Sequence, residues 1–91
     1  MITKLMGKYG LIEKDSEFLY QFLGRLQSDC KYYLGYGNRC AKYLWAGNVK
    51  EHIELMVEIM FYLCVYYGEP EWITWKDIYN YCLKMEGGEN K

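Results

Sequence analysis

The single histidine, His52, is the first residue to consider for chemistry, because an imidazole titrates near neutral pH and can act as an acid or a base. Its sequence neighbours Glu51 and Glu54 point to other sides of a helix, and no nucleophile can be identified beside it. We therefore predict that the protein is not an enzyme and that it carries no cofactor.

Four cysteines raise the alternatives of a metal site and of disulfides. They are Cys30, Cys40, Cys64 and Cys82, spaced 10, 24 and 18 residues apart without a Cys-x-x-Cys pair, whereas zinc sites use more closely spaced ligands. Cys30, Cys64 and Cys82 fall on the apolar stripes of predicted helices. We favour buried, reduced thiols in a cytosolic protein over a metal site or a disulfide.

A glycine-rich segment from Gly35 to Arg39 could bind a phosphate group through backbone amides and the Arg39 guanidinium, because a helix is predicted to follow it. No strand is predicted before the segment, and no Lys-Ser or Lys-Thr pair completes a phosphate-binding loop. We favour a glycine hinge in which Arg39 bonds backbone carbonyls or Asp29.

The segment from residue 25 to residue 50 also has the composition of a nucleic-acid-binding surface. Its net charge is +4, whereas residues 51 to 91 carry −5. Aromatic side chains alternate with cations there, which suits base stacking and phosphate contacts. The candidate nucleic-acid contacts are Lys31, Tyr36, Arg39, Lys42 and Lys50. The cations are few, and the acidic second half would repel a long duplex unless it faced away.

Protein binding fits the composition with fewer assumptions. The chain is 91 residues long, enough for one domain with one core, and 19% of it is aromatic, including 11 tyrosines. One small core does not readily hide that much ring surface, and exposed tyrosines favour protein partners. The longest apolar run, from Ile59 to Tyr67, is nine residues, short of the ~20 that span a membrane. We expect no membrane association.

Helical spacing of apolar residues predicts an all-α fold, a small single-domain bundle of about four helices. The predicted helices cover roughly residues 16–34, 39–45, 49–67 and 75–85. We expect residues 15–86 to form the helical domain, residues 1–14 to form an N-terminal arm or short element, and residues 87–91 to fray.

Capping residues mark the ends of these helices. Asp15 or Ser16 can cap the first helix, Gly35 ends it, and Asn38 caps the second. Asn48 with Glu51 forms a capping-box-like start for the long helix. Thr74 with Asp77 caps the last helix.

Three further residues are assigned to the structure rather than to chemistry. Trp45 lies at a break between two helices and is predicted to close the core between the first helix and the long helix. Asp29 precedes the glycine-rich turn, so we expect it to be at least half buried and bonded to Arg39 or to a backbone amide of the turn. Trp72, just before the last helix, belongs to the same structural group.

The end of the long helix is the candidate protein-binding surface. Past Glu58 its apolar residues no longer keep to one face, and a helix that is apolar all round is central or part of an interface. The candidate contacts are Phe61, Tyr62 and Tyr66. A homodimer through this half of the helix is one arrangement that such a surface allows.

Five short motifs, in the same order along roughly residues 18 to 85, resemble one of the large polyvalent protein-associated domains, the eleventh type. They are Leu26-Gln-Ser-Asp-Cys30, Tyr33-Leu-Gly35, Gly37-Asn-Arg39, Leu44-Trp-Ala-Gly-Asn48 and Pro70-Glu-Trp-Ile-Thr74. The family occurs in phages and conjugative elements, within very long multidomain proteins and as short chains beside antirestriction genes. The resemblance implies mobile-element biology and no established activity.

These observations together predict a non-enzymatic accessory protein of a mobile genetic element, cytoplasmic in a bacterial host, that acts by binding a protein. A host defence nuclease is one candidate partner, which would make the protein an anti-defence inhibitor, and the element's own machinery is another. The alternative is a nucleic-acid-binding module that uses the basic, tyrosine-rich segment from residue 31 to residue 50.

Overall fold

The computed structural model describes residues 4–37 and 40–87, and this part of the chain contains helices and turns but no strand. The prediction of a small all-α bundle is therefore confirmed. The elements are α1 (Lys4–Lys8), α2 (Ser16–Leu34), the 3-10 turn η1 (Ala41–Tyr43), α3 (Val49–Tyr66), α4 (Trp75–Cys82) and the π-helical turn η2 (Leu83–Gly87).

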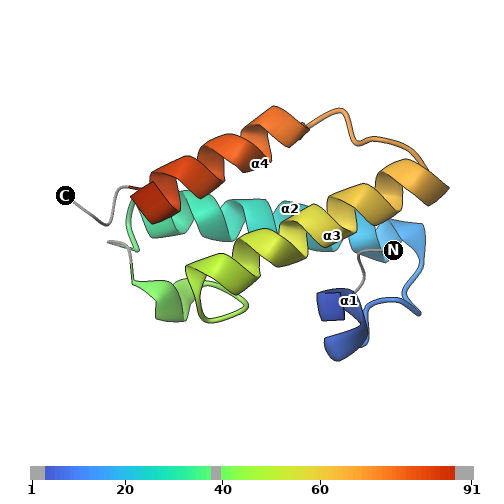
Figure 1. Ribbon diagram of the computed structural model, residues 1–91, viewed down its shortest axis with the longest axis horizontal. Coiled ribbons are helices and arrows are strands. Elements are labelled where there is room, and N and C mark those ends of the chain that lie inside the picture. The colour runs from blue at the N-terminus through green and yellow to red at the C-terminus, as the bar shows by residue number, and fades with distance from the viewer. Residues whose placement is uncertain (1–3, 38–39, 88–91) are drawn as a thin grey trace.

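α3 is the central element of the bundle. It packs against α2, against α1 and against α4 (Figure 1). Figure 1 shows α2 and α3 running in opposite directions, with α1 and α4 on opposite sides of α3. No helix in the described ranges is long and apolar enough to cross a membrane.

The core lies chiefly between α2 and α3. On α2 the buried side chains recur at three- and four-residue steps, which places them on one face of the helix: Leu19, Leu23, Leu26, Cys30 and Tyr33. On α3 the fully buried apolar residues are Leu55, Met56, Ile59, Met60 and Leu63. Full burial of such a side chain stabilises the fold by about 1.5 to 3 kcal/mol.

The ends of α2 and α4 agree with the sequence predictions. Asp15 caps α2 by accepting a hydrogen bond from the Phe18 amide at 2.9 Å. Gly35 ends α2. Thr74 and Asp77 form the complete capping box at the start of α4, in which each side chain accepts a hydrogen bond from the other residue's backbone amide.

At the start of α3, one of the two hydrogen bonds of the predicted capping box is formed. The Asn48 side chain accepts a hydrogen bond from the Glu51 amide at 2.7 Å, as a helix cap does. The Glu51 carboxylate does not close the box, because it accepts hydrogen bonds from Lys8 and Tyr9 instead.

The helix predicted over residues 39–45 is wrong. This segment holds one 3-10 turn, Ala41–Tyr43, and the backbone is extended again at Leu44. So short a segment gains too few hydrogen bonds to offset helix nucleation, and Gly47, at a φ of 86°, turns the chain toward α3. Asn38 and Arg39, the predicted cap and a predicted site residue, lie outside the described residues.

The boundaries of the other helices shift slightly. α3 ends at Tyr66 rather than residue 67, and the last helix changes from α-helical to π-helical hydrogen bonding at Leu83. The N-terminal arm contains a short helix, α1, followed by a turn in which Gly10 has a φ of 70°.

Candidate functional site

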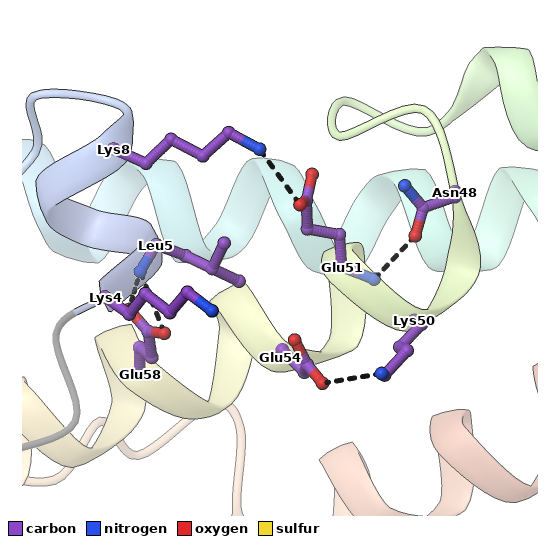
Figure 2. A pocket seen from close by; sticks show the side chains of 8 residues that line it. All are labelled: Lys4, Leu5, Lys8, Asn48, Lys50, Glu51, Glu54 and Glu58. Carbon is purple, nitrogen blue, oxygen red and sulfur yellow. Dashed lines mark hydrogen bonds and ion pairs between the residues drawn. The ribbon is translucent and has the colours of Figure 1, made fainter.

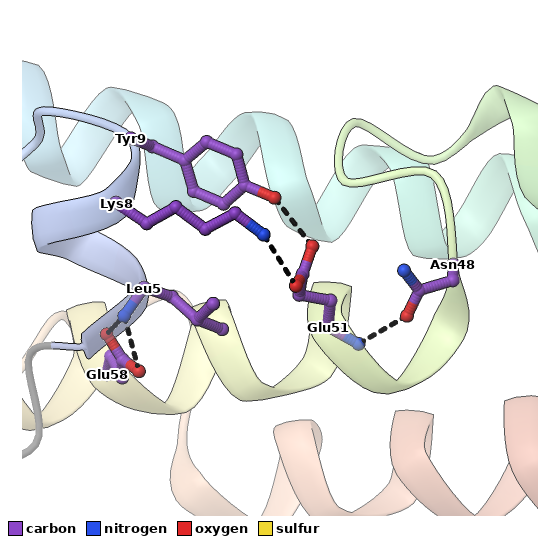
Figure 3. A network of polar contacts seen from close by, with 6 residues as sticks. All are labelled: Leu5, Lys8, Tyr9, Asn48, Glu51 and Glu58. Carbon is purple, nitrogen blue, oxygen red and sulfur yellow. Dashed lines mark hydrogen bonds and ion pairs between the residues drawn. The ribbon is translucent and has the colours of Figure 1, made fainter.

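A buried carboxylate on α3 holds the N-terminus of α1. Glu58 is 4% exposed, and its Oε1 accepts a hydrogen bond from the Leu5 amide at 2.8 Å (Figure 3). The same oxygen accepts a hydrogen bond from the Met6 amide at 2.9 Å. Glu58 Oε2 lies 3.0 Å from the Leu5 amide. The first amides of a helix have no partner within it, so Glu58 acts as the cap of α1 from 53 residues away in the sequence.

A second carboxylate of α3 holds the other end of α1. Glu51 accepts hydrogen bonds from Lys8 Nζ at 3.1 Å and from the Tyr9 hydroxyl at 2.6 Å (Figure 3). The hydrogen bonds from Tyr9 and Lys8 keep the pKa of the Glu51 carboxyl below its ordinary value. The hydrogen bond between Tyr9 and Glu51 also raises the pKa of the Tyr9 hydroxyl. We call α1, Tyr9 and the two carboxylates the α1 clasp.

The clasp borders a charged hollow of about 340 Å³ (Figure 2). Its charged lining residues are Lys4, Lys8, Lys50, Glu51, Glu54 and Glu58. The signs balance, and α1 already uses Glu51 and Glu58 as hydrogen-bond acceptors. The geometry of this hollow therefore fits the docking of α1 better than the binding of an ion.

His52 lies in the core and is 0% exposed. Its Nε2 is 2.9 Å from the Leu26 carbonyl oxygen, and because a carbonyl only accepts, Nε2 carries the proton. Within the described residues Nδ1 has no hydrogen-bond partner. Burial lowers the pKa of the imidazole. The side chain thus joins α3 to α2 and is closed to solvent.

None of the four cysteines, all of which lie in the described part of the chain, forms a disulfide. Cys30 is buried 3.6 Å from the Met56 sulfur, and burial raises its pKa to about 12. Cys64 and Cys82 are only partly buried, so the prediction of buried thiols on the helix stripes holds for Cys30 alone. Cys40 is partly buried as well. Within residues 4–37 and 40–87, no three potential ligands gather into a metal-binding group.

Asp29 takes the role predicted for it. Its side chain is 16% exposed, its Oδ2 accepts a hydrogen bond from the Trp45 amide at 3.2 Å, and its Oδ1 lies 3.8 Å from Arg25 Nε. The prediction that Asp29 is at least half buried is confirmed. Its backbone partner, Trp45, lies after the glycine-rich turn rather than within it.

Trp45 lies nearer the surface than predicted. It is 36% exposed, and its ring meets Tyr9 at 4.7 Å and Phe22 at 4.9 Å, both edge-on. The expected place in the core between α2 and α3 is wrong, because the bond to Asp29 holds Trp45 over α2, where Tyr9 covers it.

Trp72, the other structural tryptophan, packs beside Gly24 of α2. Its ring would lie 3.7 Å from a Cβ atom built at Gly24, and it lines a hollow of about 290 Å³ with Tyr20 and Gln21. Trp72 itself is 46% exposed.

The described nucleic-acid candidates lie at one end of the bundle, where α2 ends, η1 follows and α3 begins (Figure 1): Lys31, Tyr36, Lys42 and Lys50. Lys31, Tyr36 and Lys42 are exposed, and the Lys42 ammonium lies 5.5 Å from the Tyr43 ring. Lys50 is 3.9 Å from Glu54, which partly neutralises it.

The aromatic candidates lie near the opposite end of α3. Tyr62 packs against Tyr66 at 4.8 Å and against Tyr67 at 6.3 Å between ring centroids. Tyr66, Tyr67 and neighbouring Val65 are each more than half exposed. We call Tyr62, Tyr66 and Tyr67 the tyrosine cluster. Phe61, the remaining candidate, is partly buried.

Glu58 and Tyr9 are the structurally important residues that sequence reasoning missed. The available signal for Glu58 was a lone acid within an apolar run, with Met56 and Val57 before it and Ile59 and Met60 after it. An acid in such a position requires buried partners. Which partners it finds depends on a segment too short and too irregular to be placed from its own pattern.

A family model described as "Large polyvalent protein-associated domain 11" matches residues 16–85. The comparisons with curated proteins and with solved structures found no match. The match begins at the first residue of α2 and covers α2, α3 and α4, whereas the α1 clasp is completed by residues that precede it. The family is associated with polyvalent proteins of phages and other mobile elements. This chain belongs to the large polyvalent protein-associated domain 11 family.

Proposed function

We propose that this chain is a non-enzymatic accessory protein of a phage or conjugative element and that it acts by binding another protein through the tyrosine cluster. The observation that supports this most directly is the contact of three tyrosine rings at the end of α3, two of them more than half exposed. Tyrosine is enriched in protein interfaces, because its ring adds apolar contact area and its hydroxyl adds a hydrogen bond.

The cluster is suited to binding because its rings already pack against one another. Side chains that are partly ordered before association lose less conformational entropy when a partner arrives. Val65 adds an exposed aliphatic side chain beside the rings, so the surface is both apolar and able to form hydrogen bonds. A partner covering this surface would remove apolar area from water.

The setting that we propose is the cytoplasm of a bacterial host. A partner from a host defence system, such as a restriction nuclease, would make the protein an antirestriction inhibitor. A partner from the element's own machinery would make it an assembly or regulatory subunit. The family's association with mobile elements supports both roles, and the choice between them depends on the identity of the partner.

The alternative function is nucleic-acid binding at the opposite end of the bundle. The observation that favours it is the exposure of Lys31, Lys42 and the 93% exposed Tyr36 on neighbouring elements. The pairing of Lys50 with Glu54 weakens it. Binding through phosphates would fall steeply with salt, by a log-log slope of about −0.9 per contact on duplex DNA.

The test is affinity capture from the native host with the parent chain, Tyr66→Asp and two controls. Tyr66→Phe keeps the ring, and Lys42→Glu changes charge at the opposite end. We expect Tyr66→Asp to lose the captured partner while its thermal melt stays at the parent value, because this side chain is 55% exposed. Both controls should retain the partner.

Nucleic-acid binding is measured in parallel on the same proteins at about 150 mM salt. The protein-binding proposal fails if the parent chain binds DNA or RNA with micromolar or tighter affinity and loses that binding in Lys42→Glu. It also fails if Tyr66→Asp captures the same partner as the parent chain.

A further inference from the structure

An apolar hollow of about 310 Å³ opens between α3 and α4. Its floor is formed by Ile53 and Val57, one helical turn apart on α3, and its wall by Trp75 and Tyr79, one turn apart on α4. The two aromatic side chains are 40% and 63% exposed, so their ring surfaces remain in contact with solvent.

A second hollow, of about 440 Å³, continues from the same floor toward α1. Ile53 and Val57 line both hollows, and the far side of the second one is formed by Lys4, Glu54 and Glu58. Figure 2 shows these three charged residues: Lys4 and Glu58 belong to the clasp, and Glu54 lies beside it. The two hollows therefore make one groove that lies over α3, with an aromatic wall on α4 and a charged wall toward α1. We call it the α3–α4 groove.

One acid of the charged wall, Glu54, is only weakly paired with other groups of the chain. Glu58 is fully engaged by the backbone of α1, whereas the nearest cation to Glu54 is Lys50 at 3.9 Å, with side chains 52% and 80% exposed. An exposed helix pair of this kind is worth little and can exchange partners. Glu54 is therefore the acid of the groove lining that can take a new cation, and it lies on the same wall as Lys4.

The aromatic wall favours the same kind of charge. The faces of tryptophan and tyrosine rings are electron-rich and attract ammonium and guanidinium groups. A cation lying over Ile53 and Val57 would thus be attracted both by Glu54 and by Tyr79. An acidic side chain in the same place would be repelled by both.

We propose that the α3–α4 groove binds a basic amphipathic helix of another protein. Apolar side chains of that helix would cover Ile53 and Val57, and a lysine or arginine one turn away would reach Glu54 and the ring of Tyr79. Helices bind to grooves in this way through anchors spaced three or four residues apart. The inference rests on the proposed function in that the protein binds proteins, but the groove and the tyrosine cluster are different surfaces.

The experiment uses the full chain and two synthetic helical peptides of equal length. One places leucines at helical spacing with lysines beside them, and the other replaces every lysine with glutamate. Binding is followed by NMR chemical shifts of assigned side chains. The leucine–lysine peptide should shift Ile53, Val57 and Tyr79 saturably, and the leucine–glutamate peptide should bind at least tenfold more weakly.

Variants separate the groove from the rest of the surface. Glu54→Lys should reduce affinity for the leucine–lysine peptide at least tenfold, and Tyr79→Ala should weaken it as well. Tyr66→Asp, in the tyrosine cluster, should bind the peptide as the parent chain does. Since Glu54 is exposed, its variant is expected to melt with the parent chain, and a melt on each protein checks this.

Three results would overturn the inference. Equal affinity for the two peptides, or shifts spread over the whole surface, would show that the groove does not select a basic helix. Self-association that shifts the same groove residues without peptide, seen by sedimentation, would show that a second copy is the occupant. If the peptide result fails while Tyr66→Asp still loses the host partner, the groove inference falls and the proposed function stands.

Discussion

The two sides of α3 differ in how completely the chain covers them. On the α1 side, Glu58 and Glu51 accept hydrogen bonds from two backbone amides, a lysine and a tyrosine, so the polar groups of the clasp find partners within the chain. On the α4 side, Ile53 and Val57 lie at the floor of an open groove, and two partly exposed aromatic rings, Trp75 and Tyr79, line its α4 wall. The difference separates a surface used for folding from one left available for binding.

The comparison predicts that the α1 side contributes more to stability. Glu58→Ala should have the largest effect, because it leaves the Leu5 and Met6 amides without their buried acceptor. We expect it to lower the free energy of unfolding by roughly 2 to 4 kcal/mol, measured by urea unfolding. Hydrogen exchange should show faster exchange of these two amides.

Glu54→Ala is the matched control, since Glu54 lies one turn before Glu58 on the same helix and is exposed. Its unfolding free energy should stay close to that of the parent chain. Equal losses for the two variants would contradict the distinction between the two sides of α3.

Two tryptophans of similar exposure test the same comparison with apolar side chains. Trp45→Ala removes edge contacts with Tyr9 and Phe22, and should cost about 2 kcal/mol in thermal or urea unfolding. Trp45 is 36% exposed, so we expect less than the full cost of removing a core tryptophan. Trp75→Ala, at 40% exposure on the wall of the groove, should cost clearly less. A Trp75 variant less stable than the Trp45 variant would contradict the prediction that the α1 side of α3 contributes more to stability.

The main elements of the fold could be predicted from the sequence because their signals are local. The apolar stripe of α2 repeats over five turns between Asp15 and Gly35, and Thr74 and Asp77 are spaced as a capping box requires. Both signals depend on residues within a few positions of each other. The helix predicted over residues 39–45 failed because a short apolar pattern does not distinguish a helix from a single 3-10 turn.

The clasp could not be predicted because its contacts are long-range. Glu58 meets Leu5 across 53 positions, and Glu51 meets Tyr9 across 42. Trp45 was misplaced for the same reason, since Tyr9, which covers it, belongs to that distant segment. Two members of the tyrosine cluster, Tyr62 and Tyr66, were predicted as protein contacts, and the third, Tyr67, was not. The groove residues Trp75 and Tyr79 were not predicted as contacts either.

His52 provides a pH test of the buried contact between α3 and α2. The pKa of His52 in the folded protein lies below its ordinary value of 6.5, chiefly because burial disfavours the charged imidazole. As the pH falls through 6.5, the unfolded chain takes up a proton that the folded chain does not. Stability should therefore fall, by at most about 1.4 kcal/mol per pH unit.

The measurement is urea unfolding between about pH 7.5 and 5.5, above the range where most carboxylates titrate. His52→Gln is the control, because its amide can still donate to the Leu26 carbonyl and does not titrate. We expect a flatter pH profile for this variant. An unchanged slope would mean that another group causes the pH dependence.

The smallest expected effect tests how loosely the chain packs around Trp72. A methyl group at Gly24 would lie 3.7 Å from the Trp72 ring, which is an ordinary contact, and Gly24 is inside α2. Alanine favours a helix interior over glycine by about 0.8 to 1 kcal/mol. Gly24→Ala should therefore raise the unfolding free energy by roughly 0.5 to 1 kcal/mol.

Gly37→Ala is the contrasting variant, because its methyl group would lie 2.8 Å from the Tyr32 carbonyl oxygen and force the backbone to move. If Gly24→Ala destabilised the protein as well, Trp72 would be held too tightly against α2 to accommodate the methyl group.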